Sequence, residues 1–138
     1  MIQRKQSLWL LLAALFGAGA TYFDLYRATG SEPLNALSNY AFLLLGLVIT
    51  ILPLFTVFLF RNRKRQKTMT FISILANLGF IGLLLAWVAK LHNQTPPPTS
   101  GTYWIGAIFP AFSIVLLVMA LVGINKDDKL VKSMDRLR

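Results

Sequence analysis

The stretch that decides the fold is Tyr40–Phe60 (YAFLLLGLVITILPLFTVFLF), which carries no charge and is followed at once by the basic run Arg61–Lys67 (RNRKRQK). An uncharged run of this length matches the ~20 residues with which an α-helix crosses ~30 Å of hydrocarbon. Basic residues directly after such a run are typical of the cytoplasmic end of a membrane span. The stretch therefore predicts a transmembrane helix that ends on the cytoplasmic side.

Three further uncharged apolar stretches flank this one, at residues 7–23, 68–89 and 103–125. The whole chain of 138 residues is 56% hydrophobic and 14% charged, and its charges cluster between the apolar stretches. Because backbone polar groups in lipid must be satisfied within the segment, each stretch is expected to be helical. We predict an all-α membrane protein with one domain over residues 1–138. Its four transmembrane helices form an antiparallel bundle.

The basic residues set the orientation of this bundle. Arg4 and Lys5 precede the first stretch, five basic residues lie in the run Arg61–Lys67, and five more lie in the tail, residues 126–138. These segments share one side of the bundle and hold 12 of the 14 basic residues. The positive-inside rule therefore predicts that both termini are cytoplasmic.

The first apolar stretch also has features of a secretory signal. It begins with a basic segment, continues with the short apolar core Leu8–Phe16, and contains Ala18-Gly19-Ala20, which resembles a signal-peptidase site. We expect the segment to be retained as a membrane helix.

The net charge of +9 predicts a negatively charged binding partner, and anionic lipid is the simplest such partner. The basic residues flank membrane spans, so we expect contact with the lipid bilayer and its anionic headgroups and no binding of nucleic acid. The candidates for headgroup contact, or for contact with an acidic partner, are Arg61, Arg63, Lys64, Arg65 and Lys67.

Polar residues inside the predicted spans are few. No charged residue or histidine lies in the central part of a span, and the chain has no cysteine. The pattern therefore predicts no enzyme activity, no metal site and no cofactor. Asn77 and Ser73 lie one turn apart near the middle of the third span, where they predict either hydrogen-bonded helix packing or a polar wall of a conduction path. We favour helix packing.

Small residues at a spacing of four predict close helix contacts. Ala13 and Gly17 have this spacing in the first span, and Ala107 and Ala111 have it in the last. Packing inside the chain is the favoured use, and a homo-oligomer is the alternative.

The tail, residues 126–138, predicts a short cytoplasmic amphipathic helix, because Leu130, Val131, Met134 and Leu137 share one helical face. This helix either continues the fourth span or lies on the headgroups. As a partner-docking helix, the alternative, it would use Leu130, Met134, Asp135 and Arg136.

The two ends of the chain carry a family resemblance. The start Met1–Gln6 (MIQRKQ) and the ending Lys126–Arg138 (KDDKLVKSMDRLR) resemble a Bacteroidota family known as domain of unknown function 4293. The resemblance implies a multi-pass protein of the bacterial inner (cytoplasmic) membrane, and it implies no catalytic residue. Since both ends fall on the predicted cytoplasmic face, we hypothesise that Arg4 pairs with Asp135 or Asp128.

These features predict a non-catalytic accessory or scaffold subunit that associates with other membrane proteins. The alternative is a small channel or transporter of neutral or lipid-like solutes, with Asn77 and Ser73 facing a wet cavity.

Overall fold

The computed structural model describes residues 2–30, 32–93 and 100–135, and for residues 2–5, 132, 134 and 135 it describes only the backbone. The described elements are α1 (Ile2–Tyr22), β1 (Tyr26–Ala28), the 3-10 helix η1 (Ala36–Ser38), α2 (Tyr40–Phe58), the 3-10 helix η2 (Leu59–Arg61), α3 (Arg63–His92), β2 (Gly101–Tyr103) and α4 (Ile105–Asp135). The prediction of helices over all four apolar stretches is confirmed.

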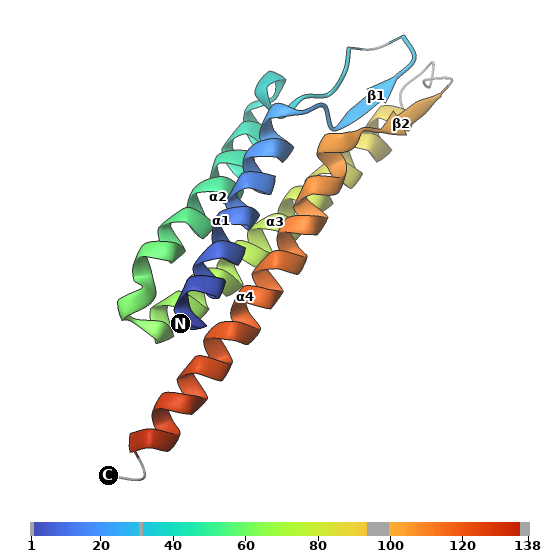
Figure 1. Cartoon of the computed structure of the whole chain (residues 1–138). Helices are drawn as coiled ribbons and strands as arrows, with labels where there is room; N and C mark the ends of the chain where they lie inside the picture. The colour runs from blue at the N-terminus through green and yellow to red at the C-terminus, as the bar shows by residue number, and fades with distance from the viewer. Residues whose placement is uncertain (1, 31, 94–99, 136–138) are drawn as a thin grey trace.

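The four long helices form an elongated bundle in which neighbours in sequence run in opposite directions (Figure 1). α1 packs against α2 and α4, and α3 packs against the same two helices. The connection between α2 and α3 is short, because η2 leads directly to Asn62, whose Oδ1 accepts a hydrogen bond from the backbone N–H of Arg65 at 3.3 Å. Arg65 lies in the first turn of α3, so this side-chain cap fixes where α3 begins.

Most of the buried residues of α2 and α3 follow one another at spacings of three or four, so each of these helices buries one narrow face. On α2 this face consists of Phe42, Gly46, Ile49, Pro53 and Thr56, and on α3 it consists of Gln66, Thr70, Ser73, Asn77, Phe80, Leu84 and Val88. This spacing is typical of helices that pack nearly antiparallel with interlocking side chains.

The outward faces of the helices are covered by large apolar side chains. Leu15 and Leu44 are each 66% exposed, and Phe58 is 75% exposed. Exposing so continuous an apolar surface to water is unfavourable for a protein of this size, whereas contact with hydrocarbon carries no such cost. Three helical segments are long and apolar enough to cross a membrane: Tyr40–Arg61, Arg63–His92 and Ile105–Val131. The apolar part of α1, Gln6–Tyr22, is shorter.

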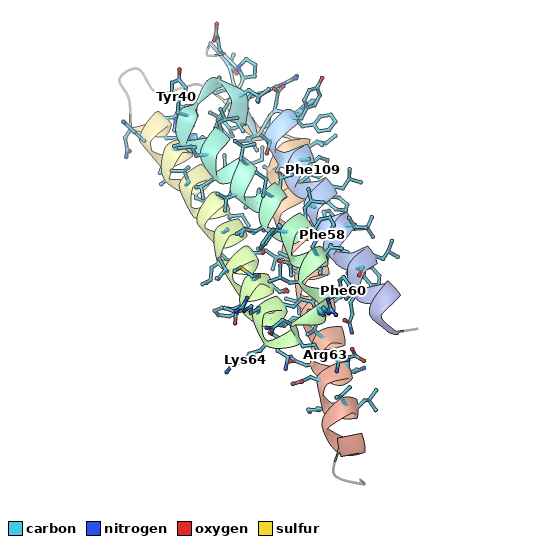
Figure 2. All side chains as sticks on the ribbon, turned by 90° about the vertical axis from the view of Figure 1, so that its left-hand side faces the viewer. Tyr40, Phe58, Phe60, Arg63, Lys64 and Phe109 are labelled. Carbon is cyan, nitrogen blue, oxygen red and sulfur yellow. The ribbon has the colours of Figure 1, made fainter. Side chains whose placement is uncertain are left out.

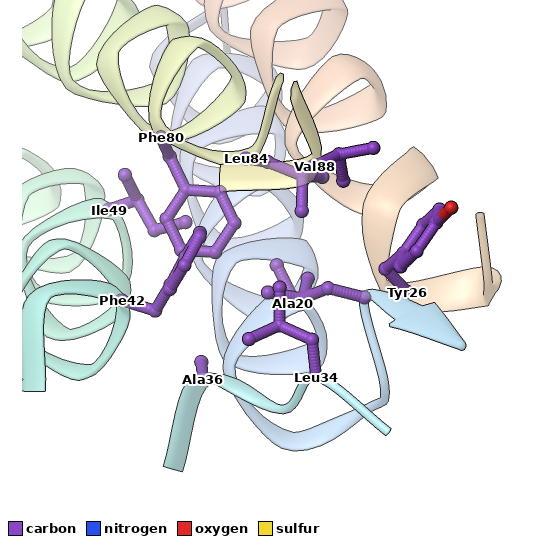
Figure 3. Close-up of a cluster of buried hydrophobic side chains, with 10 residues drawn as sticks. Ala20, Tyr26, Leu34, Ala36, Phe42, Ile49, Phe80, Leu84 and Val88 are labelled. Atoms are coloured by element: carbon purple, nitrogen blue, oxygen red, sulfur yellow. The ribbon is translucent and has the colours of Figure 1, made fainter. Parts of the chain in front are cut away.

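An apolar core lies in the half of the bundle next to β1 and β2 (Figure 3). The rings of Phe42 and Phe80 meet edge to face with their centroids 5.6 Å apart, and Ile49 packs beside them (Figure 3). Leu84 and Val88 continue this core toward the end of the bundle where β1 and β2 lie.

A small cap closes that end, and the sequence did not predict it. β1 pairs with β2 in antiparallel register, Tyr26 opposite Tyr103, and Tyr26 also bridges to Leu34. The guanidinium carbon of Arg27 lies 4.2 Å from the centroid of the Trp104 ring, and Arg27 also pairs with Asp24 at 2.6 Å. The two outer connections therefore hold each other through backbone hydrogen bonds and a cation–π contact.

The helix boundaries also differ from the predicted ones at the basic end. α3 begins at Arg63 and not at Thr68, and α4 runs without interruption to Asp135. Hydropathy marks only where the apolar part of a helix ends, and polar residues can continue the same helix beyond the membrane. The predicted tail helix is therefore the end of α4.

Candidate functional site

A group of buried polar side chains lies in the half of the bundle that carries the basic run, together with an apolar cluster of Leu10, Ala13, Leu117 and Ala120. The polar side chains are Gln6 on α1, Thr56 on α2, Gln66, Thr70, Ser73 and Asn77 on α3, and Ser113 on α4. We call this group the polar core. The sequence predicted only part of this group. Asn77 and Ser73 were expected to face the interior of the bundle, whereas Gln6 and Gln66 lie in polar segments at the ends of the apolar stretches.

Most of the polar core is satisfied by backbone carbonyls. Ser73 donates to Met69 O at 2.8 Å, and the Asn77 amide nitrogen donates to Ser73 O at 2.8 Å, both within α3. Two bonds connect different helices: Ser113 Oγ donates to Ala13 O at 3.2 Å, and Gln66 Nε2 donates to Thr56 O at 3.5 Å. The two bonds between helices fit the predicted packing role. Apolar surfaces alone give helices little tendency to associate in lipid, so hydrogen bonds between helices help to hold them together.

Within the described part of the chain, two buried polar atoms of this group, Gln6 Nε2 and Asn77 Oδ1, have no hydrogen-bond partner. An unpaired buried amide atom costs about 1–3 kcal/mol relative to a paired one. One turn farther along α3, Phe80 meets Phe42, so the aromatic pair separates the polar core from the capped end.

Two ion pairs join α3 to α4 at the basic end. Arg63 pairs with Asp127 at 3.3 Å and also donates to the Asp127 carbonyl oxygen at 3.2 Å, and Lys67 Nζ lies 2.8 Å from Asp128 Oδ2. We call these two pairs the α3–α4 clamp. A cavity of only about 10 Å³ lies beside the clamp, lined by Gln6, Ser7, Phe60, Arg63, Gln66 and Asp127.

The basic run is thus divided into two sets. Arg63 and Lys67 are half-buried and engaged in the clamp, whereas Arg61, Lys64 and Arg65 are exposed. Figure 2 shows Arg63 and Lys64 at the same end of the bundle as Phe60. Only the second set is open to a headgroup or a partner.

The small residues were predicted to mark close helix contacts, and the structure places them differently in α1 and α4. A Cβ on Gly17 would lie 2.7 Å from the carbonyl oxygen of Ile49, so α1 and α2 touch backbone to backbone there. Ala13 is buried, Ala107 packs partly buried against the apolar core, and Ala111 is exposed. Other close contacts at glycines were missed, among them Gly46 against Thr21 and Gly106 against the Asp24 carbonyl. Their glycines were visible in the sequence, but their partners were not.

An apolar crevice of about 360 Å³ lies between α1 and α4. Its lining consists of Leu15, Phe16, Ala18, Gly19, Tyr22, Phe23 and Phe109. The Phe109 ring rests on Gly19, where a Cβ would come within 2.6 Å of it, and Phe109 also meets Phe16 edge to face. Leu15 and Tyr22 are mostly exposed, so the crevice opens onto the outer surface of the bundle.

The remaining predicted positions lie near the ends of helices. Leu130 is 51% exposed on the last part of α4. The side chains of Met134 and Asp135, and all of Arg136, lie outside the described residues, as does the side chain of Arg4. His92 ends α3, with Nδ1 2.9 Å from Val88 O. Across residues 2–30, 32–93 and 100–135, no three histidine, aspartate or glutamate side chains gather in the way a metal ion would need.

Comparisons with known proteins give one match. A family model described as "Domain of unknown function (DUF4293)" matches residues 2–137. No curated protein and no solved structure matches the chain. Since the match covers nearly the whole chain, this protein belongs to the DUF4293 family.

Proposed function

We propose that this chain is a multi-pass protein of the bacterial inner membrane, with all four helices crossing and both termini in the cytoplasm. The three long apolar helices support a membrane location. The apolar helix α1 packs against α2 and α4, which supports a fourth crossing beside them. The basic residues favour the orientation, because the turn between α2 and α3 lies at the end opposite the β1–β2 cap (Figure 1). This turn carries Arg61, Lys64 and Arg65.

Within that membrane the chain acts as a non-catalytic scaffold that binds a transmembrane helix of another protein. The apolar crevice between α1 and α4 is the observation that carries this proposal. Its floor is the glycine–aromatic contact of Gly19 and Phe109, and its lip is the small, exposed Ala18. Small residues let a neighbouring helix come close, and aromatic walls supply contact area for it.

The end of α4 supports the same role. α4 passes beyond the other three helices at the basic end, and the α3–α4 clamp fixes the point where it does so (Figure 1). A helix that is held at its base leaves the bundle in a defined direction, and it exposes Leu130. Because α4 also carries Phe109, one partner can contact both the crevice and this projecting segment.

Filling the crevice should remove the partner and leave the fold intact. Ala18→Trp places an indole at the lip, where a partner helix would lie. Ala111→Trp is the control, since Ala111 is exposed on α4 and does not line the crevice. After extraction in a mild detergent, native mass spectrometry should find the wild type and Ala111→Trp with a stoichiometric protein partner, and Ala18→Trp without it. A wild-type chain recovered with lipid only would contradict the proposal.

The alternative, a small channel or transporter of neutral or lipid-like solutes, is favoured by the polar core and its two unpaired amide atoms. Such atoms are what a wet path would offer to water or a solute. The Phe42–Phe80 pair lies across this path one turn above Asn77. We therefore rank the scaffold first.

A further inference from the structure

A groove of about 550 Å³ lies where the end of α2 meets the beginning of α3. Its lining consists of Phe55 and Leu59 from the α2 side and Lys64, Arg65, Thr68 and Met69 from the α3 side. The volume falls within the range of about 300–1,000 Å³ that is usual for small-molecule sites. The groove is open on one side, where Phe55 is exposed.

The two ends of the groove differ in chemistry. Phe55, Leu59 and Met69 form the apolar part of the groove, on the side toward the middle of the bundle, and they belong to the helical segments that can cross a membrane. Lys64 and Arg65 form a rim with two positive charges at the end of those segments. An amphipathic molecule with a negative head and an apolar tail would match both parts at once.

The rim charges are not neutralised within the described part of the chain. The ion pairs there place Asp127 on Arg63 and Asp128 on Lys67, and no carboxylate lies within 4 Å of Lys64 or Arg65. The clamp therefore engages Arg63 and Lys67, and it leaves Lys64 and Arg65 available to the groove.

We propose that this groove binds one anionic phospholipid of the cytoplasmic leaflet. The lipid phosphate lies against Lys64 and Arg65, and one acyl chain lies along Phe55, Leu59 and Met69. The site rests on the proposed membrane orientation, which places the rim at the depth of the headgroups. It differs from general attraction to a charged membrane because it also requires an empty apolar groove below the charges.

The test is lipid retention in nanodiscs that contain neutral lipid with a minor fraction of phosphatidylglycerol. Native mass spectrometry counts the anionic lipids that stay bound to the released protein. Lys64→Gln combined with Arg65→Gln should lower the retention of one anionic lipid about 30-fold, given the usual contribution of two basic residues. Lys126→Gln combined with Lys129→Gln removes the same net charge from exposed positions on α4 and should leave retention unchanged.

A second variant isolates the apolar part of the site. Leu59→Trp fills the groove and keeps all basic residues, so the bound lipid should be lost although the charge is intact. Adding glycerol phosphate without acyl chains should not compete with the bound lipid, which separates a lipid from a free phosphate. Equal retention in the two charge variants, or retention in Leu59→Trp, would overturn the site. Failure of the wild type to enter nanodiscs would instead contradict the membrane placement itself.

Discussion

Gly17→Leu should be strongly destabilising, with an expected loss of about 3 kcal/mol or more in the free energy of unfolding. A Cβ at this position would lie 2.7 Å from the Ile49 carbonyl oxygen, 3.0 Å from its carbon and 3.2 Å from the Thr50 nitrogen. These are backbone atoms of α2, so they cannot rotate away as a side chain would. α1 and α2 would have to separate, which also disturbs the polar core and the apolar core between them.

Gly79→Leu is the matched control for this substitution. Gly79 lies within α3, which is long and apolar enough to cross a membrane, and a Cβ there would meet nothing within 4 Å among the described residues. Thermal unfolding in the same detergent should give a large drop in melting temperature for Gly17→Leu and almost none for Gly79→Leu. Equal effects would show that the contact between α1 and α2 is not close at Gly17.

The second large effect is expected at Asn77, where the size of the stability loss depends on the substituent. Asn77→Asp introduces a charge at a fully buried position of α3, and a carboxylate at the centre of a membrane helix costs about 2.5–3.5 kcal/mol. Asn77→Leu removes the unpaired amide oxygen and introduces no charge, but its larger side chain must be accommodated in the packed core. We therefore expect a smaller loss of stability than for Asn77→Asp. Unfolding in detergent measures both differences against the wild type.

The same pair of variants separates helix packing from conduction. In a dry core the aspartate has no water to solvate it, so Asn77→Asp fails and Asn77→Leu folds. In a water-filled path the aspartate would be solvated and tolerated, and leucine would block the path. A stable Asn77→Asp protein would therefore favour the channel alternative over the scaffold.

The main features of the fold could be predicted from this sequence because the solvent imposes them. Uncharged runs such as Tyr40–Phe60 can satisfy their backbone in hydrocarbon only as helices, so they reveal helix type and approximate position. The short connection between α2 and α3 then makes these two helices antiparallel. The boundaries were less predictable, since Asn62 and not the last basic residue marks the start of α3.

The cap over the bundle could not be predicted, because it depends on pairings between distant residues. Tyr26 pairs with Tyr103, and Arg27 packs on Trp104. Segments as short as Tyr26–Ala28 have no periodicity of their own, and their strand conformation exists only because the bundle brings both connections to the same end.

The candidate sites were predictable only in part for the same reason. The basic run was evident as a set of charges, but its division depends on Asp127 and Asp128, more than fifty residues away. The crevice depends on Phe109 lying over Gly19, which no local pattern indicates. Residue type thus identified the polar and charged positions, and the packing of the helices decides what each one contacts.

The placement of this bundle in a membrane, with its basic end in the cytoplasm, can be measured directly because the chain has no cysteine. Single cysteines at exposed positions of the two ends, Glu32→Cys and Lys64→Cys, would each be the only thiol in the protein. In spheroplasts treated with a membrane-impermeant maleimide, Glu32→Cys should be labelled, and Lys64→Cys should be labelled only after the membrane is permeabilised. Labelling of Lys64→Cys in intact spheroplasts, with Glu32→Cys protected, would contradict the proposed orientation and the lipid site that depends on it.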